Sequence, residues 1–257
     1  MTVIFSFGDE QYDEDWGAIF TEVKRSPASD NIFVCHTSVE DLSKIASELS
    51  KAVVDKSWVV ELDVGAKRAY ETIAAKTAQK LVDIFENKKF SDDKISSDFG
   101  EIMVSMGSAR ALGTIFSHIS IPLAELWKPK LTGNEGFDFH TVCPGKIINF
   151  GEAKFSSSGS PYGGNSGDSS GAGGQADGFI SDEKHLMDGV HLPHLAGEEA
   201  AENLNNDIYG VVLAFSINAE NPLIVFKHAV QKALSYSHLK KAKNIYIVGV
   251  SHASLTD

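Results

Sequence analysis

The sequence has few cysteines, few basic residues and no long apolar run, and each shortage excludes a class of protein. Only Cys35 and Cys143 occur among the 257 residues, without a CxxC pair, which argues against a disulfide framework and a zinc site. No stretch of about eighteen apolar residues occurs, so we expect no transmembrane helix. The N-terminal run VIFSF has no basic flank. It predicts a strand rather than a signal peptide, and we expect a cytoplasmic protein.

The charge balance is acidic. Asp and Glu number 35 against 23 Lys and Arg, which gives a formal net charge of −12. A chain with this charge repels polyphosphates, so we expect the free protein to bind nucleic acid weakly. Hydrophobic residues make up 42% and charged residues 23% of the sequence, a balance typical of a globular protein with a full core. The composition therefore predicts one enlarged folded domain.

Apolar patterning predicts an α/β fold. In the first 95 residues strand-like and helical patterns alternate, with strands expected at 3–7, 31–35 and 57–64 and helices at 39–54 and 66–86. A further helix is expected at 99–119, where Gly107 and Gly113 suggest close packing against a neighbouring element. The C-terminal part is expected to form helical segments within 175–187 and 192–206, then a strand at 209–217, a helix at 223–239 and a strand at 244–251.

The segment GFDFHTVCPGKIINFGEAKF, residues 136–155, carries the most informative pattern. Two apolar runs flank a Pro-Gly dipeptide, which predicts a β-hairpin. Because side chains alternate along a strand, Glu152 and Lys154 should point to the same face, with Asp138 on the neighbouring strand beside them. The Gly/Ser-rich stretch 156–174 cannot bury apolar area and predicts a mobile loop directly after the hairpin.

Two carboxylates and one ammonium group on adjacent strands suit metal-dependent phosphodiester hydrolysis. That reaction needs a nucleophilic water, a Lewis acid and help for the departing oxygen, and oxygen ligands that hold Mg²⁺ or Mn²⁺ meet these needs. We therefore predict Asp138 and Glu152 as metal ligands. We predict that Lys154 orients or activates the attacking water and stabilises the developing negative charge.

The order GFDF followed by GEAKF, with fourteen residues from Asp138 to Glu152, resembles the D…ExK core of the PD-(D/E)xK nuclease superfamily. From about residue 97 onward, the order of motifs also resembles the nuclease subunit of Hachiman-type bacterial antiphage defence systems, which works beside a helicase. The resemblance implies a restriction-endonuclease-like mixed β-sheet flanked by helices at 96–257, with 1–95 as an N-terminal α/β extension packed on it. It further implies a DNA substrate and a helicase or other ATPase partner.

The same resemblance implies two more site residues. Glu101, in the helix before the hairpin, matches an additional metal-binding Glu of the superfamily, and Gln175 matches a Gln that often follows ExK on the next helix. Each residue also has a simpler interpretation. Glu101 would be a carboxylate favoured by the dipole at a helix N-terminus, and Gln175 would be a helix cap at the end of the loop.

Two other functions stay open at this point. A catalytically inactive nuclease fold that serves as a protein-interaction or DNA-sensing subunit would fit the acidic charge, but it has no chemical reason to keep Asp138, Glu152 and Lys154 at this spacing. A carboxylate-pair hydrolase would use Asp138 and Glu152 as acid and base. Against that function, Lys154 should lower the pKa of Glu152, which suits a metal ligand better than a general acid.

Histidines and lysines near the motif allow weaker predictions. His140, two residues after Asp138, would approach the metal, whereas His191 and His194 flank a proline and suggest a surface loop. Lys128 and Lys130 would either meet DNA phosphates or simply aid solubility.

Overall fold

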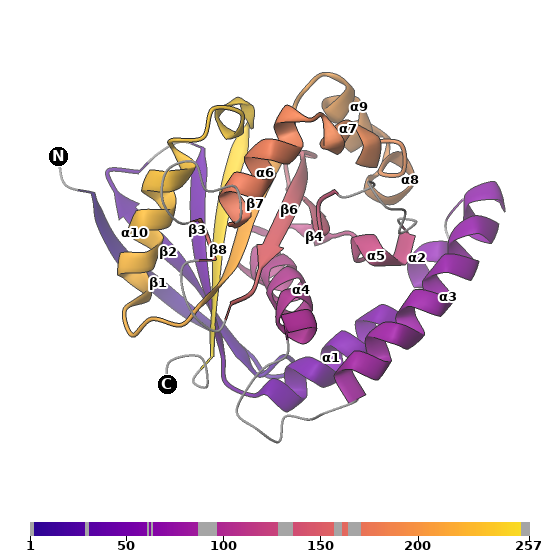
Figure 1. Cartoon of the computed structure of the whole chain (residues 1–257), viewed down its shortest axis with the longest axis horizontal. Coiled ribbons are helices and arrows are strands. Elements are labelled where there is room, and N and C mark those ends of the chain that lie inside the picture. Colours follow the sequence, from indigo (N-terminus) through magenta and orange to yellow (C-terminus); the bar gives the residue numbers. More distant parts are fainter. Residues whose placement is uncertain are drawn as a thin grey trace.

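The centre of the fold is a mixed β-sheet of eight strands with helices on both faces (Figure 1). The computed structural model describes residues 3–28, 31–60, 62, 64–86, 97–127, 136–156, 161–163 and 171–252. The predicted α/β fold, a mixed sheet flanked by helices, is confirmed. Among the described residues, none of the helices has the length and apolarity needed to cross a bilayer.

The strands lie in the order β1-β2-β3-β8-β7-β6-β5-β4 across the sheet. Their bounds are Ile4–Asp13 (β1), Ala18–Ser26 (β2), Ile32–Val39 (β3), Ile119–Ser120 (β4), Phe139–Val142 (β5), Ile148–Lys154 (β6), Gly210–Ile217 (β7) and Asn244–His252 (β8). The four central strands β3, β8, β7 and β6 are parallel, and the outer pairs on both sides are antiparallel. Parallel strands covered on both faces are expected to be continuously apolar. All eight residues of β7, GVVLAFSI, are accordingly buried.

The helices occupy both faces and one end of the sheet (Figure 1). Their bounds are Leu42–Val54 (α1), Ser57–Val60 (α2), Val64–Glu86 (α3), Ser97–Phe116 (α4), Ala124–Trp127 (α5), Ala172–Ser181 (α6), Lys184–Asp188 (α7), Pro193–Ala196 (α8), Glu198–Asn205 (α9), Pro222–Ala233 (α10) and the 3₁₀ turn Leu239–Lys241 (η1). The helices predicted near 39–54, 66–86, 99–119 and 223–239 are confirmed with shifted ends.

Alternation along the strands divides the core into two layers. One layer contains Phe150 of β6 and Leu213 of β7 with side chains of α6 and α10, such as Phe226. The other contains Ala153 of β6 and Val212 of β7 with side chains of α4 and α1. Even-numbered residues of β6 therefore face α6, and odd-numbered residues face α4.

Helix α4 lies between the sheet and helices α1 and α3, so most of its surface is buried. The predicted close packing at Gly107 is wrong, because a side chain there would meet nothing within 4 Å. At Gly113 an added Cβ would lie 3.3 Å from a backbone oxygen. The tightest approach along α4 is at Gly100, where an added Cβ would lie 2.3 Å from the ring of Phe155. This glycine lets the N-terminal part of α4 lie directly on the end of β6.

The N-terminal region extends the same sheet rather than alternating strand and helix. Strands β1, β2 and β3 form an antiparallel meander, and β3 joins the rest of the sheet by pairing in parallel with β8. Strand β2 was not predicted, and β1 is longer than expected. Strand β2 has the sequence AIFTEVKRS, in which three charged residues obscure the apolar pattern. Strand β1 lies at the edge of the sheet and its residues are mostly exposed, so apolar patterning does not mark its full length.

The strand predicted at 57–64 is also wrong, since this segment forms α2 and the start of α3. Asp55 begins the turn by accepting hydrogen bonds from the backbone N (2.8 Å) and the Oγ (2.9 Å) of Ser57. A short polar side chain that bonds the backbone two residues later favours a helical start over a strand. The β-branched residues of SWVV instead place Val59 in the core.

Only part of the predicted loop 156–174 is described, namely 156, 161–163 and 171–174. Its last three residues belong to α6, which begins at Ala172. Lys128 and Lys130 lie outside the described residues.

Helix α10 offers a test of the core. Phe226 is 0% exposed and its ring packs against those of Phe215 and His36, whereas Ile224 on the same helix is 53% exposed. We expect Phe226→Ala to lower the free energy of unfolding by about 3–5 kcal/mol, because it leaves a cavity in the core. Ile224→Ala should change it by less than about 0.5 kcal/mol. Urea titration followed by circular dichroism measures both, and equal effects would contradict this assignment of the core.

Candidate active site

The hairpin formed by β5 and β6 carries the three predicted catalytic residues. The two strands pair antiparallel with Phe139 opposite Gly151, so the predicted hairpin is confirmed. On its other side β6 pairs in parallel with β7, which places Glu152 beside Leu213 and Lys154 beside Phe215. Glu152 and Lys154 therefore share the face that α6 covers.

The Glu152 side chain is completely buried, at 0% exposure. Its Oε1 lies 2.9 Å from Nζ of Lys154. Its Oε2 has no hydrogen-bond partner among the described residues. A buried carboxylate oxygen without a partner is costly, and a bound ion or water would relieve that cost.

Asp138 lies immediately before β5 and is tied to β6 at two points. Its backbone N donates to the Gly151 carbonyl oxygen (2.9 Å), and its Oδ2 accepts from the backbone N of Ala153 (2.8 Å). These bonds hold the Asp138 carboxylate next to the backbone between Glu152 and Lys154. The structure thus brings all three predicted residues together.

Burial and the negative charge of Asp138 hold the pKa of Glu152 well above its usual range, although Lys154 lowers it and Glu101 raises it further. Lys154 lowers the pKa of Glu152 as predicted, but burial and the charge of Asp138 raise it more, so the net shift is upward. A neighbouring ammonium group does not offset the loss of hydration of a fully buried carboxylate. The charged form of Glu152 is therefore disfavoured where it lies, and a bound cation would offset that cost.

Lys154 is 23% exposed and stays positively charged. Burial lowers its pKa, but Glu152, Asp138 and Glu101 together raise it more, so its pKa lies above the ordinary value. Glu101 is exposed on α4, and its charge acts on both Glu152 and Lys154. The structure therefore brings Glu101 into the same electrostatic cluster, and the group contains three carboxylates against one ammonium.

Gln175 lies on α6 and is half-buried. It shares a helical stripe with Ala172, Ala176 and Phe179, which are buried against the sheet. Gln175 therefore lies on the side of α6 that faces β6, although no contact between it and the carboxylates is described. Its backbone N donates to the Gly171 carbonyl within the helix start, so it is not the N-cap itself.

The structure gives the histidines partners that were not predicted from the sequence. His140 is buried, and its Nε2 lies 3.1 Å from Oδ2 of Asp188, with its ring against Phe150. His191 is not in a free surface loop, since its Nδ1 is hydrogen-bonded to the hydroxyl of Tyr70 on α3. His194 lies in the short helix α8.

Sequence reasoning missed two devices that position the site. Gly100 allows α4 to rest on Phe155, one residue after Lys154, and so fixes where Glu101 lies. Ser216 of β7 clamps the chain after β6, because its Oγ accepts from the backbone N of Ser156 (2.9 Å) and donates to the Ser156 carbonyl (3.0 Å). A serine inside the apolar run GVVLAFSI was the available sign of the second device.

The donor chemistry fits a hard divalent cation. Carboxylate oxygens are the preferred ligands of Mg²⁺ and Mn²⁺, and Glu152 supplies a buried oxygen that needs a partner. In the described part of the chain, however, no three His, Cys, Asp or Glu side chains already form a metal-binding group. The fit therefore rests on the unpartnered Glu152 oxygen and on the chemistry of its neighbours Asp138 and Glu101.

Comparison with protein families, with curated proteins and with solved structures finds no match to this chain.

The raised pKa of Glu152 makes stability depend on pH. A carboxyl group whose pKa is raised by folding favours the folded state in its protonated form. This contribution to stability is complete below about pH 4.5 and is lost as pH rises through the raised pKa. In metal-free buffer we expect Glu152→Gln to unfold like the wild type below about pH 4.5 and to be more stable at neutral pH. The difference should be about 1.4 kcal/mol for each unit by which the pKa is raised.

Urea titrations at several pH values measure this difference, with the exposed Glu71→Gln on α3 as a control that should show no such trend. If Glu152→Gln is less stable than the wild type at neutral pH, the carboxylate does not occupy the unfavourable environment described here.

Proposed function

We propose that the protein is a metal-dependent nuclease that hydrolyses phosphodiester bonds in DNA. The observation that carries the proposal is the fully buried Glu152, whose Oε2 has no partner among the described residues although Asp138 and Lys154 lie beside it. A carboxylate in this position is destabilising unless a cation binds it. The arrangement on a β-hairpin between helices α4 and α6 also agrees with the core that the PD-(D/E)xK resemblance implies.

Asp138, Glu152 and Glu101 would hold Mg²⁺ or Mn²⁺, which supplies a Lewis acid for the phosphate and its attacking water. Asp138 is held in place by the backbone N of Ala153, and Glu152 by the centre of the sheet. Glu101 is exposed on a helix whose position Gly100 fixes. Two of the proposed ligands are thus rigidly supported, as pre-organised catalysis requires.

Lys154 would orient the attacking water and stabilise negative charge on the phosphate. Its raised pKa keeps it protonated at neutral pH, so it donates hydrogen bonds and does not remove a proton from water. Two contacts limit where the ammonium group of Lys154 can move. It pairs with Glu152, and Ser216 holds the backbone at Ser156, two residues after Lys154. We therefore assign to Lys154 the orientation of the attacking water and the stabilisation of negative charge. We no longer assign to it the activation of that water by proton removal.

A carboxylate-pair hydrolase fits less well, even though the pKa of Glu152 is raised as a general acid requires. A general acid must come within hydrogen-bond distance of the leaving oxygen of the substrate. Glu152 is 0% exposed, so a sugar oxygen cannot come within hydrogen-bond distance of it.

The cleavage assay follows from these roles. With Mg²⁺ present, the wild type should cut plasmid or linear DNA, and Lys154→Ala, Glu152→Gln and Asp138→Asn should each lower the rate by at least about 100-fold. Lys227→Ala, an exposed lysine on α10, serves as the matched control and should cut like the wild type. Gel electrophoresis of the products over time measures the rates, with EDTA as a blank for each variant.

Any of the three variants cutting at the wild-type rate would place the chemistry elsewhere. If the wild type neither cuts nor binds Mg²⁺, the chain is instead an inactive nuclease fold that acts through interaction.

We further propose that a helicase or another ATP-driven partner delivers the DNA, as the resemblance to antiphage defence nucleases implies. The net charge of −12 supports this idea, since phosphate neutralisation by Lys and Arg supplies most non-specific affinity. Arg110 and Lys51 are moreover paired with carboxylates on the surface of the described chain. An acidic subunit offers electrostatic complementarity to a basic partner.

The isolated chain should therefore bind DNA weakly. We expect a dissociation constant above about 1 µM for a 30-base-pair duplex at about 0.15 M salt. Fluorescence anisotropy with labelled DNA and Ca²⁺ in place of Mg²⁺ measures binding without cleavage. Nanomolar affinity of the chain alone would show that it needs no partner for delivery.

A further inference from the structure

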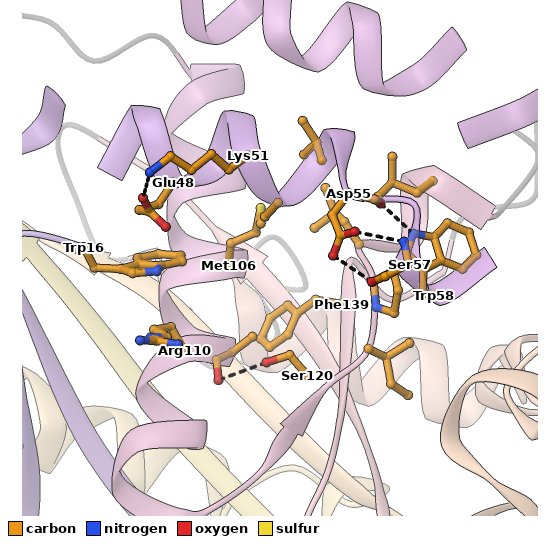
Figure 2. A pocket seen from close by; sticks show the side chains of 17 residues that line it. Trp16, Glu48, Lys51, Asp55, Ser57, Trp58, Met106, Arg110, Ser120 and Phe139 are labelled. Carbon is orange, nitrogen blue, oxygen red and sulfur yellow. Dashed lines mark hydrogen bonds and ion pairs between the residues drawn. The ribbon is translucent and has the colours of Figure 1, made fainter. Parts of the chain in front are cut away.

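A cavity of about 660 Å³ separates the N-terminal helices from the core. Its walls come from α1, α2 and the turn between them on one side, and from α4, β4 and β5 on the other (Figure 2). None of Asp138, Glu152, Lys154, Glu101 and Gln175 lines it. The volume lies in the range of small-molecule sites, which is roughly 300–1,000 Å³.

The interior of the cavity is apolar. Met106 of α4 and Phe139 of β5 project into it (Figure 2), and Val53 of α1 also lines it. Aromatic and thioether side chains of this kind favour a flat apolar ligand over a hydrated one. None of these three side chains forms a strong hydrogen bond with water. Replacing water in the cavity with an apolar ligand is therefore favourable.

One end of the cavity is held rigid by Asp13. Its Oδ2 accepts from Nε (2.8 Å) and Nη2 (2.7 Å) of Arg110, and its Oδ1 accepts from the backbone N of Trp16 (3.2 Å). Asp13 thus ties the backbone of Trp16 to the guanidinium of Arg110, and the Trp16 side chain itself is buried. A guanidinium has five N–H donors, and its remaining donors have no partner among the described residues. Arg110 lines the cavity and its side chain is 47% exposed, so these donors are open to solvent or to a ligand at this end.

The other end is held rigid by Asp55. Its carboxylate binds Ser57 as described above, and its carbonyl oxygen accepts from Nε1 of Trp58 (3.1 Å). Figure 2 shows Trp16 and Trp58 at opposite ends of the cavity. The Trp58 indole is held by this hydrogen bond and the Trp16 indole by its burial before any ligand arrives, which lowers the entropic cost of binding.

The lining residues carry two charges of each sign, and Asp13 behind Arg110 adds one more negative charge. Lys51 and Arg110 balance Glu48 and Asp55, and Lys51 already pairs with Glu48 at 2.5 Å. A multiply charged phosphate therefore gains no net attraction here. A neutral molecule with hydrogen-bond acceptors along one edge can still bind the open donors of Arg110.

We propose that this cavity binds an uncharged planar heteroaromatic molecule of about the size of a purine nucleoside. Its ring lies among the apolar and indole side chains, and its acceptor edge faces Arg110. The site gives the N-terminal region a role, since α1 and α2 form one wall. The opposite wall contains α4, which carries Glu101, and Phe139, which follows Asp138.

Isothermal titration calorimetry of the full chain with adenosine and with guanosine tests the proposal. At least one of them should bind 1:1 with a dissociation constant below about 1 mM. Arg110→Gln should weaken that binding at least about 10-fold, and so should Ala52→Phe, which fills the cavity from an exposed position on α1. Arg68→Gln, on the exposed surface of α3, is the matched control and should bind like the wild type.

Several results would overturn the proposal. These are the absence of binding by both nucleosides at about 5 mM, binding that neither Arg110→Gln nor Ala52→Phe changes, or AMP binding more than about 10-fold tighter than adenosine. Circular dichroism confirms that each variant is folded before titration. Because calorimetry needs no cleavage, the outcome is independent of the proposed nuclease function.

Discussion

The carboxylate of Glu152 has lost its hydration, and the surrounding structure is arranged around that fact. It lies in the parallel part of the sheet between β5 and β7, with an ammonium group 2.9 Å from one oxygen and no hydrogen-bond partner for the other among the described residues. Removing a carboxylate from water costs on the order of several kcal/mol, and a single ion pair rarely offsets that cost. Selection for stability alone would favour an apolar residue here. The position therefore indicates a function that needs a charged oxygen inside the sheet.

The neighbouring elements hold that carboxylate in place from several sides. Asp138 is fixed to the backbone of β6, Ser216 clamps the chain just after Lys154, and Gly100 lets α4 lie on Phe155. Each of these contacts joins β6 to a different element, namely the start of β5, β7 and α4. A site assembled in this way is rigid where chemistry needs it to be, and the exposed Glu101 is the proposed ligand with the most freedom.

The sequence predicted the fold class, the hairpin and the convergence of Asp138, Glu152 and Lys154, because strand alternation and a Pro-Gly turn are local signals. It failed where tertiary context decided the outcome. Strand β2 carries Glu22, Lys24 and Arg25 and is stabilised by pairing with β1 and β3 rather than by its own pattern. The run SWVVELDV has strand-like composition, but the Asp55 turn starts a helix there. The sign of the Glu152 pKa shift depended on depth of burial and on Asp138, neither of which a linear motif reveals. The PD-(D/E)xK resemblance and the roles it implies for Glu101 and Gln175 stay predictions.

The central claim is that the buried Glu152 oxygen is a cation ligand. Electron paramagnetic resonance titration of Mn²⁺ tests it directly, since free Mn²⁺ gives a signal that binding broadens, and no substrate or partner is required. The account predicts that the wild type binds one tightly held Mn²⁺ per chain and that Glu152→Gln, at matched folding, binds it at least about 10-fold more weakly. Equal Mn²⁺ binding by the two proteins, or none by the wild type, would contradict it.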